Sequence, residues 1–176
     1  MTTETTTKIS PLDLLSDLLA KAKRAGADAA DAVTSDGVAL SVTQRLGKRE
    51  DLERSEGQDI GLRVFVGKQQ AIVSTSDISD AAMNEMVERA VAMAKAAPED
   101  PYCGLADPSQ LAATVAELDL LDPHEPDGEE LYARAAAAED AARAVKGVTN
   151  SDGAGASWSR SERALVTSDG FAGSYV

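Results

Sequence analysis

The chain has 176 residues, 43% of them apolar, which is enough for one medium domain or two small ones with a real core. It contains one Trp, three Tyr and two Phe, so Ala, Val and Leu must fill most of that core. Thirty acidic against seventeen basic residues give a formal charge of −13, which disfavours binding to nucleic acid or to an anionic membrane surface.

The cysteine content and the N-terminal residues indicate a compartment. A single cysteine, Cys103, excludes an internal disulfide framework. The stretch Met1–Lys8 is polar and rich in Thr, without the apolar segment of a signal peptide. No apolar run approaches the roughly 20 residues that a membrane span needs. We therefore expect a cytoplasmic protein that does not insert into a membrane.

The first predicted element is a helix over residues 10–25. Ser10 offers an N-cap, Pro11 suits the first helical position, and Gly26 ends the helix. Apolar residues recur at helical spacing and predict one buried stripe. This stripe consists of Leu12, Leu15, Leu19 and Ala22, widened by Leu14 and Leu18.

Two strands are predicted next, over residues 28–34 and 38–42. A turn at Ser35-Asp36-Gly37 should separate them, and a second turn is expected at Gly47-Lys48. The stretch Lys48–Glu56 is nearly all charged, which suits an exposed edge or a solvated ribbon better than a central strand.

Residues 57–95 carry the clearest pattern in the chain. Apolar residues alternate from Ile60 to Val66, Gly67-Lys68 reverses the chain, and a second strand follows, so the sequence predicts a β-hairpin. Asp77 or Ser79 then caps a helix that should extend to Ala97. Its apolar stripe must cover a sheet, and is formed by Met83, Met86, Val87, Ala90 and Ala94.

The rest of the sequence predicts a linker followed by a second unit. Five of the six prolines lie between residues 98 and 126, which precludes a continuous helix or a central strand there. A helix from Asp127 to Val145 follows, then an antiparallel β region, and Phe171–Val176 resembles a strand that has just begun. The expected stripe of this helix is Leu131, Ala135, Ala138, Ala142 and Val145.

We therefore predict an α+β fold. An antiparallel sheet built from residues 28–75, with the two helices packed on one face, forms an N-terminal domain over residues 1–97. A proline-rich linker covers residues 98–126. Residues 127–176 begin a second, partial α+β unit, which we expect to be truncated.

The triplet Ser-Asp-Gly occurs at residues 35, 151 and 168, beside alternating segments each time. It could form a ligand loop. The turn interpretation is favoured, because Asp-Gly is a preferred pair for type I′ turns.

Few residues are suited to metal or nucleophilic chemistry. His124 and Cys103 cannot complete a metal site alone, so we interpret His124 as a solvated linker residue and Cys103 as a small, buried or half-buried thiol. The acidic pairs Glu129-Glu130 and Glu139-Asp140 fall on a predicted helix, where a solvated face is favoured over acid–base catalysis.

Two further positions are candidate binding residues. Arg63 projects from a strand opposite the apolar face and could grip a carboxylate or line the solvent side, and the solvent side is favoured. Gly153-Ala154-Gly155 precedes a strand rather than a helix, so it lacks the helix N-terminus of a phosphate site. We assign no catalytic, cofactor-binding or metal residue to this chain.

Four segments in this order resemble the N-terminal half of the TldD/PmbA family, whose members are also called modulators of DNA gyrase. They are Gly26–Ala30, the hairpin within Gly61–Asp77, Asp100–Pro108 and Val148–Gly153. The resemblance covers nearly all of the chain after residue 10, and the PmbA branch fits best. The negative charge argues against interpreting the gyrase name as DNA binding.

The resemblance implies the non-catalytic N-terminal portion of a cytoplasmic zinc metalloprotease subunit that processes peptides and unfolded protein segments. The family's zinc motif, His-Glu-x-x-x-His, has no match here, so zinc is expected only in a TldD-type partner or in a C-terminal half. The implied partners are a TldD/PmbA-type subunit, in a homo- or heterodimer, and a peptide that adds to a strand edge. The alternative is a non-enzymatic interaction or scaffold module.

Overall fold

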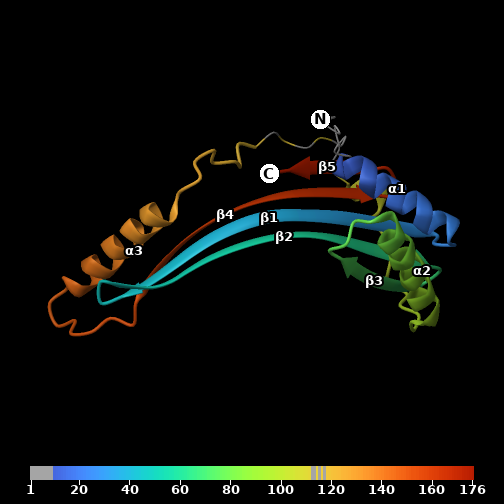
Figure 1. The fold of residues 1–176 in the computed structure, drawn as a ribbon. Coiled ribbons are helices and arrows are strands. Elements are labelled where there is room, and N and C mark those ends of the chain that lie inside the picture. Colours follow the sequence, from blue (N-terminus) through green and yellow to red (C-terminus); the bar gives the residue numbers. More distant parts are fainter. Residues whose placement is uncertain (1–9, 112–113, 115, 117) are drawn as a thin grey trace, which may run out of the picture. The chain divides into compact units, whose positions relative to one another are not determined.

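The computed structural model describes residues 10–111, 114, 116 and 118–176, so the polar start predicted at Met1–Lys8 lies outside the described residues. Five strands form one antiparallel sheet in the order β3-β2-β1-β4-β5 (Figure 1). Together with the helices they confirm the α+β fold. In chain order the elements are α1 (Pro11–Arg24), β1 (Ala29–Arg45), β2 (Lys48–Val66), β3 (Gln69–Thr75), α2 (Asp80–Ala96), a 3₁₀ turn (Pro108–Gln110), α3 (Gly128–Arg143), β4 (Ala154–Thr167) and β5 (Ala172–Tyr175).

Contacts group the chain into two compact units. The first unit contains the described residues within Met1–Asp36, Gln58–Glu117 and Glu162–Tyr175. The second unit contains Gly37–Gly57 and Leu118–Ser161. Since both units draw on segments before and after residues 98–126, the division into domains at that linker stays a prediction.

Helix α1 forms as its sequence predicts. Pro11 takes the first turn, basic residues fill the last turn, and Gly26 follows with a φ of +103°. Ser10 is the residue before the helix, but its side chain makes no capping hydrogen bond. Its carbonyl instead accepts the amide of Leu14 at 3.0 Å.

The β2–β3 hairpin and α2 also match the sequence. The strands pair from Ile60 opposite Thr75 to Val66 opposite Gln69, and Gly67 turns the chain with a φ of +57°. The Ser79 hydroxyl caps α2 by accepting the amide of Ala82 at 3.3 Å.

One apolar cluster holds the first unit together. It joins α1 and α2 to alternate residues of β1, β2, β3 and β4, so both helices cover one face of the sheet, as predicted. The cluster consists of Leu15, Leu18, Leu19, Ala22, Ala27, Ala30, Ala32, Ile60, Leu62, Val64, Ala71, Val73, Met83, Met86, Val87, Ala90, Val91, Ala94, Ala164 and Val166.

The turn predicted at Ser35-Asp36-Gly37 is wrong. These residues lie inside β1, a single strand of 17 residues. A Cβ at Gly37 would lie 3.5 Å from the carbonyl oxygen of Arg160 on β4, so this glycine faces a neighbouring strand and not a loop. Pairing in the sheet overrides the local turn preference of Asp-Gly. The actual β1–β2 turn is Leu46-Gly47, one residue before the predicted position.

The strands after α3 do not form a separate β region. β4 lies beside β1 in the same sheet, so a sheet built from residues 28–75 alone was incomplete. The final Ser-Asp-Gly triplet does form a turn, because the amide of Gly170 donates to the carbonyl of Thr167 at 3.1 Å. β5 then pairs back onto β4, with Arg163 opposite Tyr175.

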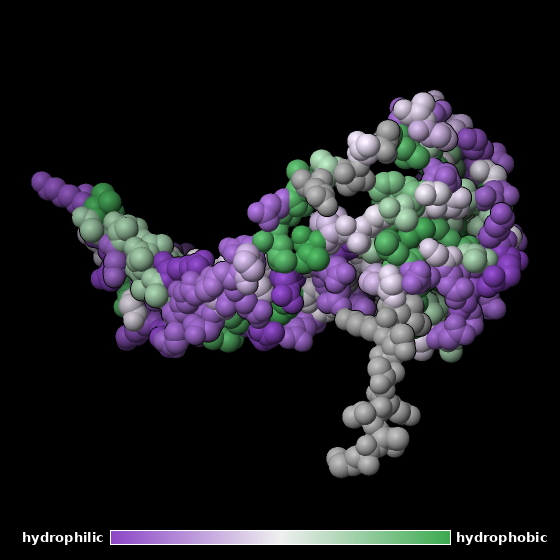
Figure 2. Space-filling view, turned by 90° about the horizontal axis from the view of Figure 1, so that it is seen from above, coloured by the Kyte–Doolittle hydropathy of each residue, from purple (hydrophilic) through white to green (hydrophobic). Residues whose placement is uncertain are grey.

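The second unit has a small core under α3. Leu40, Val42, Leu131, Tyr132 and Ala135 form it, and Trp158 packs against it while half-buried. The predicted stripe of α3 is wrong beyond Ala135, since Ala138, Ala142 and Val145 are exposed while Tyr132 and Glu139 are buried. Figure 2 shows the resulting weakly apolar surface over α3.

Replacing Met86 by Asp should lower the free energy of unfolding by about 3 to 5 kcal/mol, because a charge would enter the core without a partner. Met86 is 1% exposed, whereas Met93 on the same helix is 48% exposed. Met93→Asp is therefore the matched control and should change stability by less than about 1 kcal/mol. Urea denaturation of both variants measures the difference, and equal losses would contradict the assigned core.

Candidate functional site

The strand β3 is the outer edge of the sheet in the first unit. Its residues Gln69–Thr75 pair with β2 on one side, and among the described residues no third segment bonds to their main-chain groups, although the Gln69 side-chain amide donates to the carbonyls of Lys95 and Ala97. Ala71 and Val73 are buried in the core, while Ile72 between them is 67% exposed. The strand contains no charged residue and no proline.

Charge distinguishes this edge from another outer stretch of the sheet. Among the described residues, β3 pairs with β2 only from Ile60 onward, so Lys48–Gly57 also lies at an edge. Seven of those ten residues are charged, and all ten are exposed, as the sequence predicted. Charged side chains protect an edge strand against pairing with another chain, and β3 lacks that protection. Its free main-chain groups can therefore accept an extended segment.

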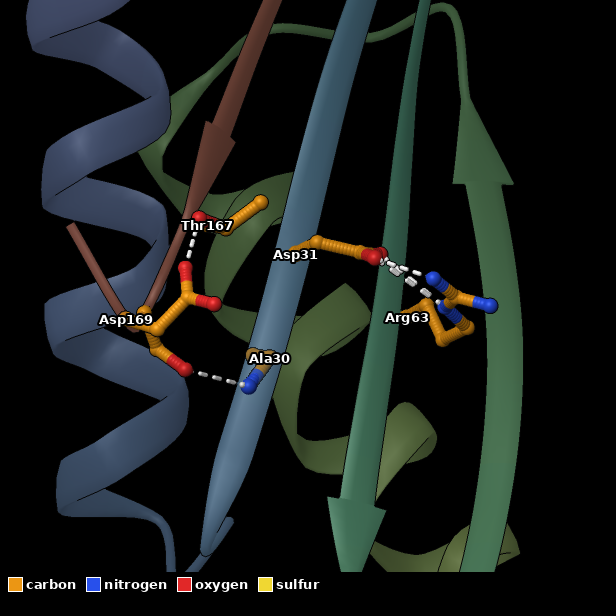
Figure 3. A network of polar contacts seen from close by, with 6 residues as sticks. Ala30, Asp31, Arg63, Thr167 and Asp169 are labelled. Carbon is orange, nitrogen blue, oxygen red and sulfur yellow. Dashed lines mark hydrogen bonds and ion pairs between the residues drawn. The ribbon is translucent and has the colours of Figure 1, made fainter. Parts of the chain in front are cut away.

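An ion pair lies directly beside Ile72, because Arg63 is its cross-strand neighbour on β2. Arg63 reaches Asp31 on β1 (Figure 3), with its Nε 3.1 and 3.2 Å from the two carboxylate oxygens, and its Nη2 donates to the same group. The hydrogen bond to Asp31 raises the pKa of Arg63. Arg63 therefore does both things that the sequence left open, since its side chain is 37% exposed on the face opposite the core and its guanidinium binds an internal carboxylate 32 residues away.

A second polar network fastens the β4–β5 turn to β1. The amide of Ala30 donates to the hydroxyl of Ser168 at 3.0 Å, and the amide of Ser168 donates to the carbonyl of Ala30 at 2.8 Å. Thr167 and Asp169 bond to each other within the turn (Figure 3). These hydrogen bonds hold the turn against β1, which agrees with the turn interpretation of this triplet.

A shallow depression of about 330 Å³ lies next to that turn. α1 contributes Ser16 and Lys23 to its wall, and the start of β1 contributes Asp28. The Asp28 carboxylate is already bonded to the amide of Gly67 at 2.7 Å. The depression therefore brings together no set of free polar groups with a common chemistry.

Glu139 is the most unusual ionisable residue of the second unit. It lies on α3, is only 2% exposed, and its carboxylate enters the β1–β2 turn. It accepts the amides of Leu46 at 2.7 Å and Gly47 at 2.9 Å, and the side-chain amide of Gln44 at 3.1 Å. The solvated face predicted for Glu139 is therefore wrong, although its neighbour Asp140 is exposed.

These hydrogen bonds keep the Glu139 carboxylate charged. Its pKa falls from 4.5 to about 2, first because of the Ser151 side chain and then because of the Gly47 amide, the Leu46 amide and Gln44, against the opposing effect of burial. Leu46 has a φ of 51° and Gly47 of 73°, so the two central residues have the signs of a type I′ turn. In such a turn both central amides point away from the ladder, and one carboxylate can bind both.

Exposed ion pairs involve residues at the N-terminal end of α3. Glu129 binds Arg49 through two hydrogen bonds of 2.6 and 2.5 Å, and Arg49 lies 4.3 Å from the centre of the Tyr132 ring. Glu130 contacts His124 at 2.7 Å and Arg134 at 2.5 Å. Both carboxyls have lowered pKa values because of these side-chain hydrogen bonds. Partial exposure limits what such pairs contribute to stability.

The candidate residues for metal, nucleophilic and phosphate chemistry do not come together in the fold. Cys103 is buried and unpaired, His124 is exposed, and within the described part of the chain no three His, Cys, Asp or Glu side chains form a group that could hold a metal ion. Gly153 approaches β1 so closely that a Cβ would lie 2.8 Å from the carbonyl oxygen of Gln44. Strand packing therefore explains this glycine. The expectation of no site residue stays a prediction.

Among the described helices, none combines the length and the apolar character that crossing a membrane would require.

Two family models match the chain. The model of PmbA/TldA metallopeptidase domain 1 matches residues 30–94, and the model of the PmbA/TldA metallopeptidase central domain matches residues 121–176. The chain is 37% identical over 134 residues to the metalloprotease PmbA homolog of Haemophilus influenzae and 33% identical over 127 residues to metalloprotease PmbA of Escherichia coli O157:H7. These alignments cover 76% and 72% of the chain, but it spans only 30% and 28% of those relatives.

Solved structures share the fold. A proposed modulator of DNA gyrase from Bacteroides thetaiotaomicron superposes with a TM-score of 0.76 and 19% identity, over 92% of this chain and 37% of that protein. TldE from Thermococcus kodakarensis gives a TM-score of 0.75 and 16% identity, over 92% of this chain and 36% of that protein. At this level of identity the similarity bears on the fold alone.

Replacing Glu139 by Gln should destabilise the protein and reduce the pH dependence of its stability. A carboxyl with a lowered folded-state pKa contributes stability above its ordinary pKa of 4.5 and loses it as the pH falls toward about 2. Wild-type stability should therefore decline more steeply than that of Glu139→Gln between pH 5 and pH 2.

Asp140→Asn on the same helix is the matched control, because Asp140 is exposed. Urea denaturation at several pH values measures the three proteins. Parallel pH profiles for wild type and Glu139→Gln would contradict the role assigned to Glu139.

Proposed function

Because the chain belongs to the PmbA/TldD family, we propose that it is the non-catalytic N-terminal portion of a zinc metalloprotease subunit. Its role in the whole protein is the proteolysis or processing of peptides and unfolded protein segments in the cytoplasm. The metalloprotease names of two relatives support the reaction class. The observation that carries the role of this chain is the uncharged, free edge of β3.

An extended peptide binds by adding as a further strand beside β3. Main-chain N–H and C=O groups make the hydrogen bonds, so binding tolerates many sequences. Ile72 provides apolar contact for a peptide side chain on the exposed side, and Arg63 behind it is fixed by Asp31. The net charge of −13 favours the approach of basic peptides over acidic ones.

Zinc is supplied elsewhere in the assembly. We place it in a TldD-type partner subunit or in a C-terminal portion of the protein, with this chain forming part of a homo- or heterodimer. The donor set of the chain supports this assignment, since it has one His and one Cys, and within the described residues no three His, Cys, Asp or Glu side chains form a group that could hold a metal ion.

A non-enzymatic interaction or scaffold module is the second candidate. The many internally satisfied charges favour it, since Arg63, Arg49 and Glu139 all have structural partners. The two candidate functions predict different results when the chain is mixed with a zinc-bearing subunit of the family and peptide cleavage is measured. Peptide cleavage that depends on both components supports the protease role, and assembly without any effect on cleavage supports the scaffold.

Peptide addition predicts a localised response in the ¹⁵N-labelled protein. Titration with an unstructured basic peptide should shift and protect amides of Gln69–Thr75, and leave Lys48–Gly57 unaffected. Ile72→Lys should weaken binding about threefold to fivefold, because a cross-strand contact contributes up to about 1 kcal/mol.

Leu52→Lys is the matched control, since Leu52 is a half-exposed apolar residue on the charged edge of β2. Equal losses in both variants, or shifts outside β3, would refute the assigned binding edge.

Purified alone, the chain should bind no stoichiometric zinc and cleave no peptide, because no three potential zinc ligands come together among its described residues. Elemental analysis of tag-free protein and a quenched-fluorescence peptide assay measure the two properties. Tight, equimolar zinc or cleavage abolished by a chelator would show that the chain itself is catalytic.

A further inference from the structure

The side chain of Asn150 lies against the main-chain amide that follows it. Residues 148–153 form neither a helix nor a strand, and Asn150 is exposed. The amide of Ser151 donates to the Oδ1 atom of Asn150 at 2.9 Å. The side-chain carbon Cγ is bonded directly to that oxygen, so the Ser151 nitrogen lies next to an electrophilic carbon. Asparagine is a chemically labile residue, and this arrangement favours the loss of its side-chain amide.

We propose that Asn150 is a site of spontaneous deamidation. The Ser151 nitrogen attacks Cγ of Asn150 and forms a C–N bond. The bond between Cγ and Nδ2 breaks, and the side-chain nitrogen leaves as ammonia with the proton of the Ser151 amide. Water then opens the cyclic succinimide. Opening at Cγ gives aspartate in an unchanged main chain, whereas opening at the main-chain carbonyl carbon gives isoaspartate, whose main chain is longer by the Cβ methylene.

The other asparagine of the chain, Asn84, lacks this arrangement. It lies inside α2, where the following amide, that of Glu85, is beyond the first turn and is therefore bonded within the helix. The Asn84 side chain bonds instead to Asp80. Asn84 and Asn150 are both exposed, so exposure does not distinguish them. The position of the following amide does, and it predicts that Asn150 reacts and Asn84 does not.

Asp152 is a competing site, because Gly153 follows it and an Asp-Gly pair can form the same succinimide. The Gly153 amide, however, donates to the hydroxyl of Ser151 at 3.0 Å. The negative charge of the Asp152 carboxylate also resists attack by a nucleophile, whereas the Asn150 amide is neutral. Isoaspartate in this segment should therefore come from Asn150.

Isoaspartate at position 150 would disturb the contacts that anchor the β1–β2 turn. The Ser151 carbonyl accepts the Nε of Arg45 at 3.2 Å, and the Ser151 side chain contacts Glu139, whose pKa it lowers. The carboxylate of Glu139 in turn binds both central amides of the turn. The extra methylene enters the main chain directly before Ser151 and displaces these groups. Deamidation therefore loosens the turn with time.

Ageing the full chain at mildly alkaline pH tests the site. Tryptic cleavage gives the peptides 147–160 and 69–89, which carry the two asparagines separately. Mass spectrometry follows the replacement of NH₂ by OH in each. Deamidation in 147–160 should be at least about tenfold faster than in 69–89, and no slower than in a synthetic, unstructured copy of 147–160. Isoaspartyl methyltransferase with labelled S-adenosylmethionine measures the isoaspartate that forms.

Asn150→Gln should abolish this methylation, because glutamine would have to close a larger ring, while the matched control Asn84→Gln should leave it unchanged. Hydrogen exchange at the amides of Leu46 and Gly47 should rise about threefold or more in aged wild type but not in aged Asn150→Gln. Circular dichroism checks that both variants are folded.

Equal deamidation rates in the two tryptic peptides would overturn the assigned site. So would a rate in the folded chain below that of the synthetic peptide, or methylation that survives Asn150→Gln. Unchanged exchange at the β1–β2 turn in chains that have formed isoaspartate would overturn the assigned effect on the turn.

Discussion

The hydrogen bonds between the Glu139 carboxylate and the Leu46-Gly47 turn fix the hairpin on which the fold depends. That turn joins β1 and β2, which run for 17 and 19 residues and take part in both compact units. A two-residue turn sets the register of its strands, and a slip of one residue would move every side chain to the opposite face. Leu46 has an unfavourable positive φ for a residue with a side chain, so the turn benefits from an external partner. The buried carboxylate provides it.

Local patterns allowed part of this fold to be predicted from the sequence. The β2–β3 hairpin and α2 need only neighbouring residues to form, and the alternation from Ile60 to Val66 and the cap at Ser79 identify them. The place of β4 beside β1 could not be predicted, because it depends on pairing between residues more than a hundred positions apart. The turn predicted at Ser35-Asp36-Gly37 was wrong for the same reason, since pairing with the neighbouring strands stabilises an extended chain more than Asp-Gly favours a turn.

The candidate site shows the same division. Residues 71–75 were recognisable as a strand, but only the strand order shows that β3 is an edge. The partner of Arg63 lies on a different strand, and the burial of Glu139 depends on a turn 92 residues away. Periodicity assigned Ala138 to the core in place of Glu139, because hydropathy alone cannot show that a carboxylate will be fully hydrogen-bonded when buried. The sequence alone thus shows that Lys48–Gly57 is charged and that β3 is not. It does not show that both stretches lie at an edge of the sheet.

The single Trp gives the protein an optical property that follows from its place in the fold. Trp158 packs half-buried against the small core under α3, so intrinsic Trp fluorescence reports on the second unit. Circular dichroism, by contrast, averages over α1, α2 and α3 and therefore over both units. Unfolding followed by the two signals separates a cooperative molecule, in which the curves coincide, from one whose units melt in sequence. Because β1, β2 and β4 are shared by both units, this comparison measures how far a continuous strand transmits cooperativity between two cores.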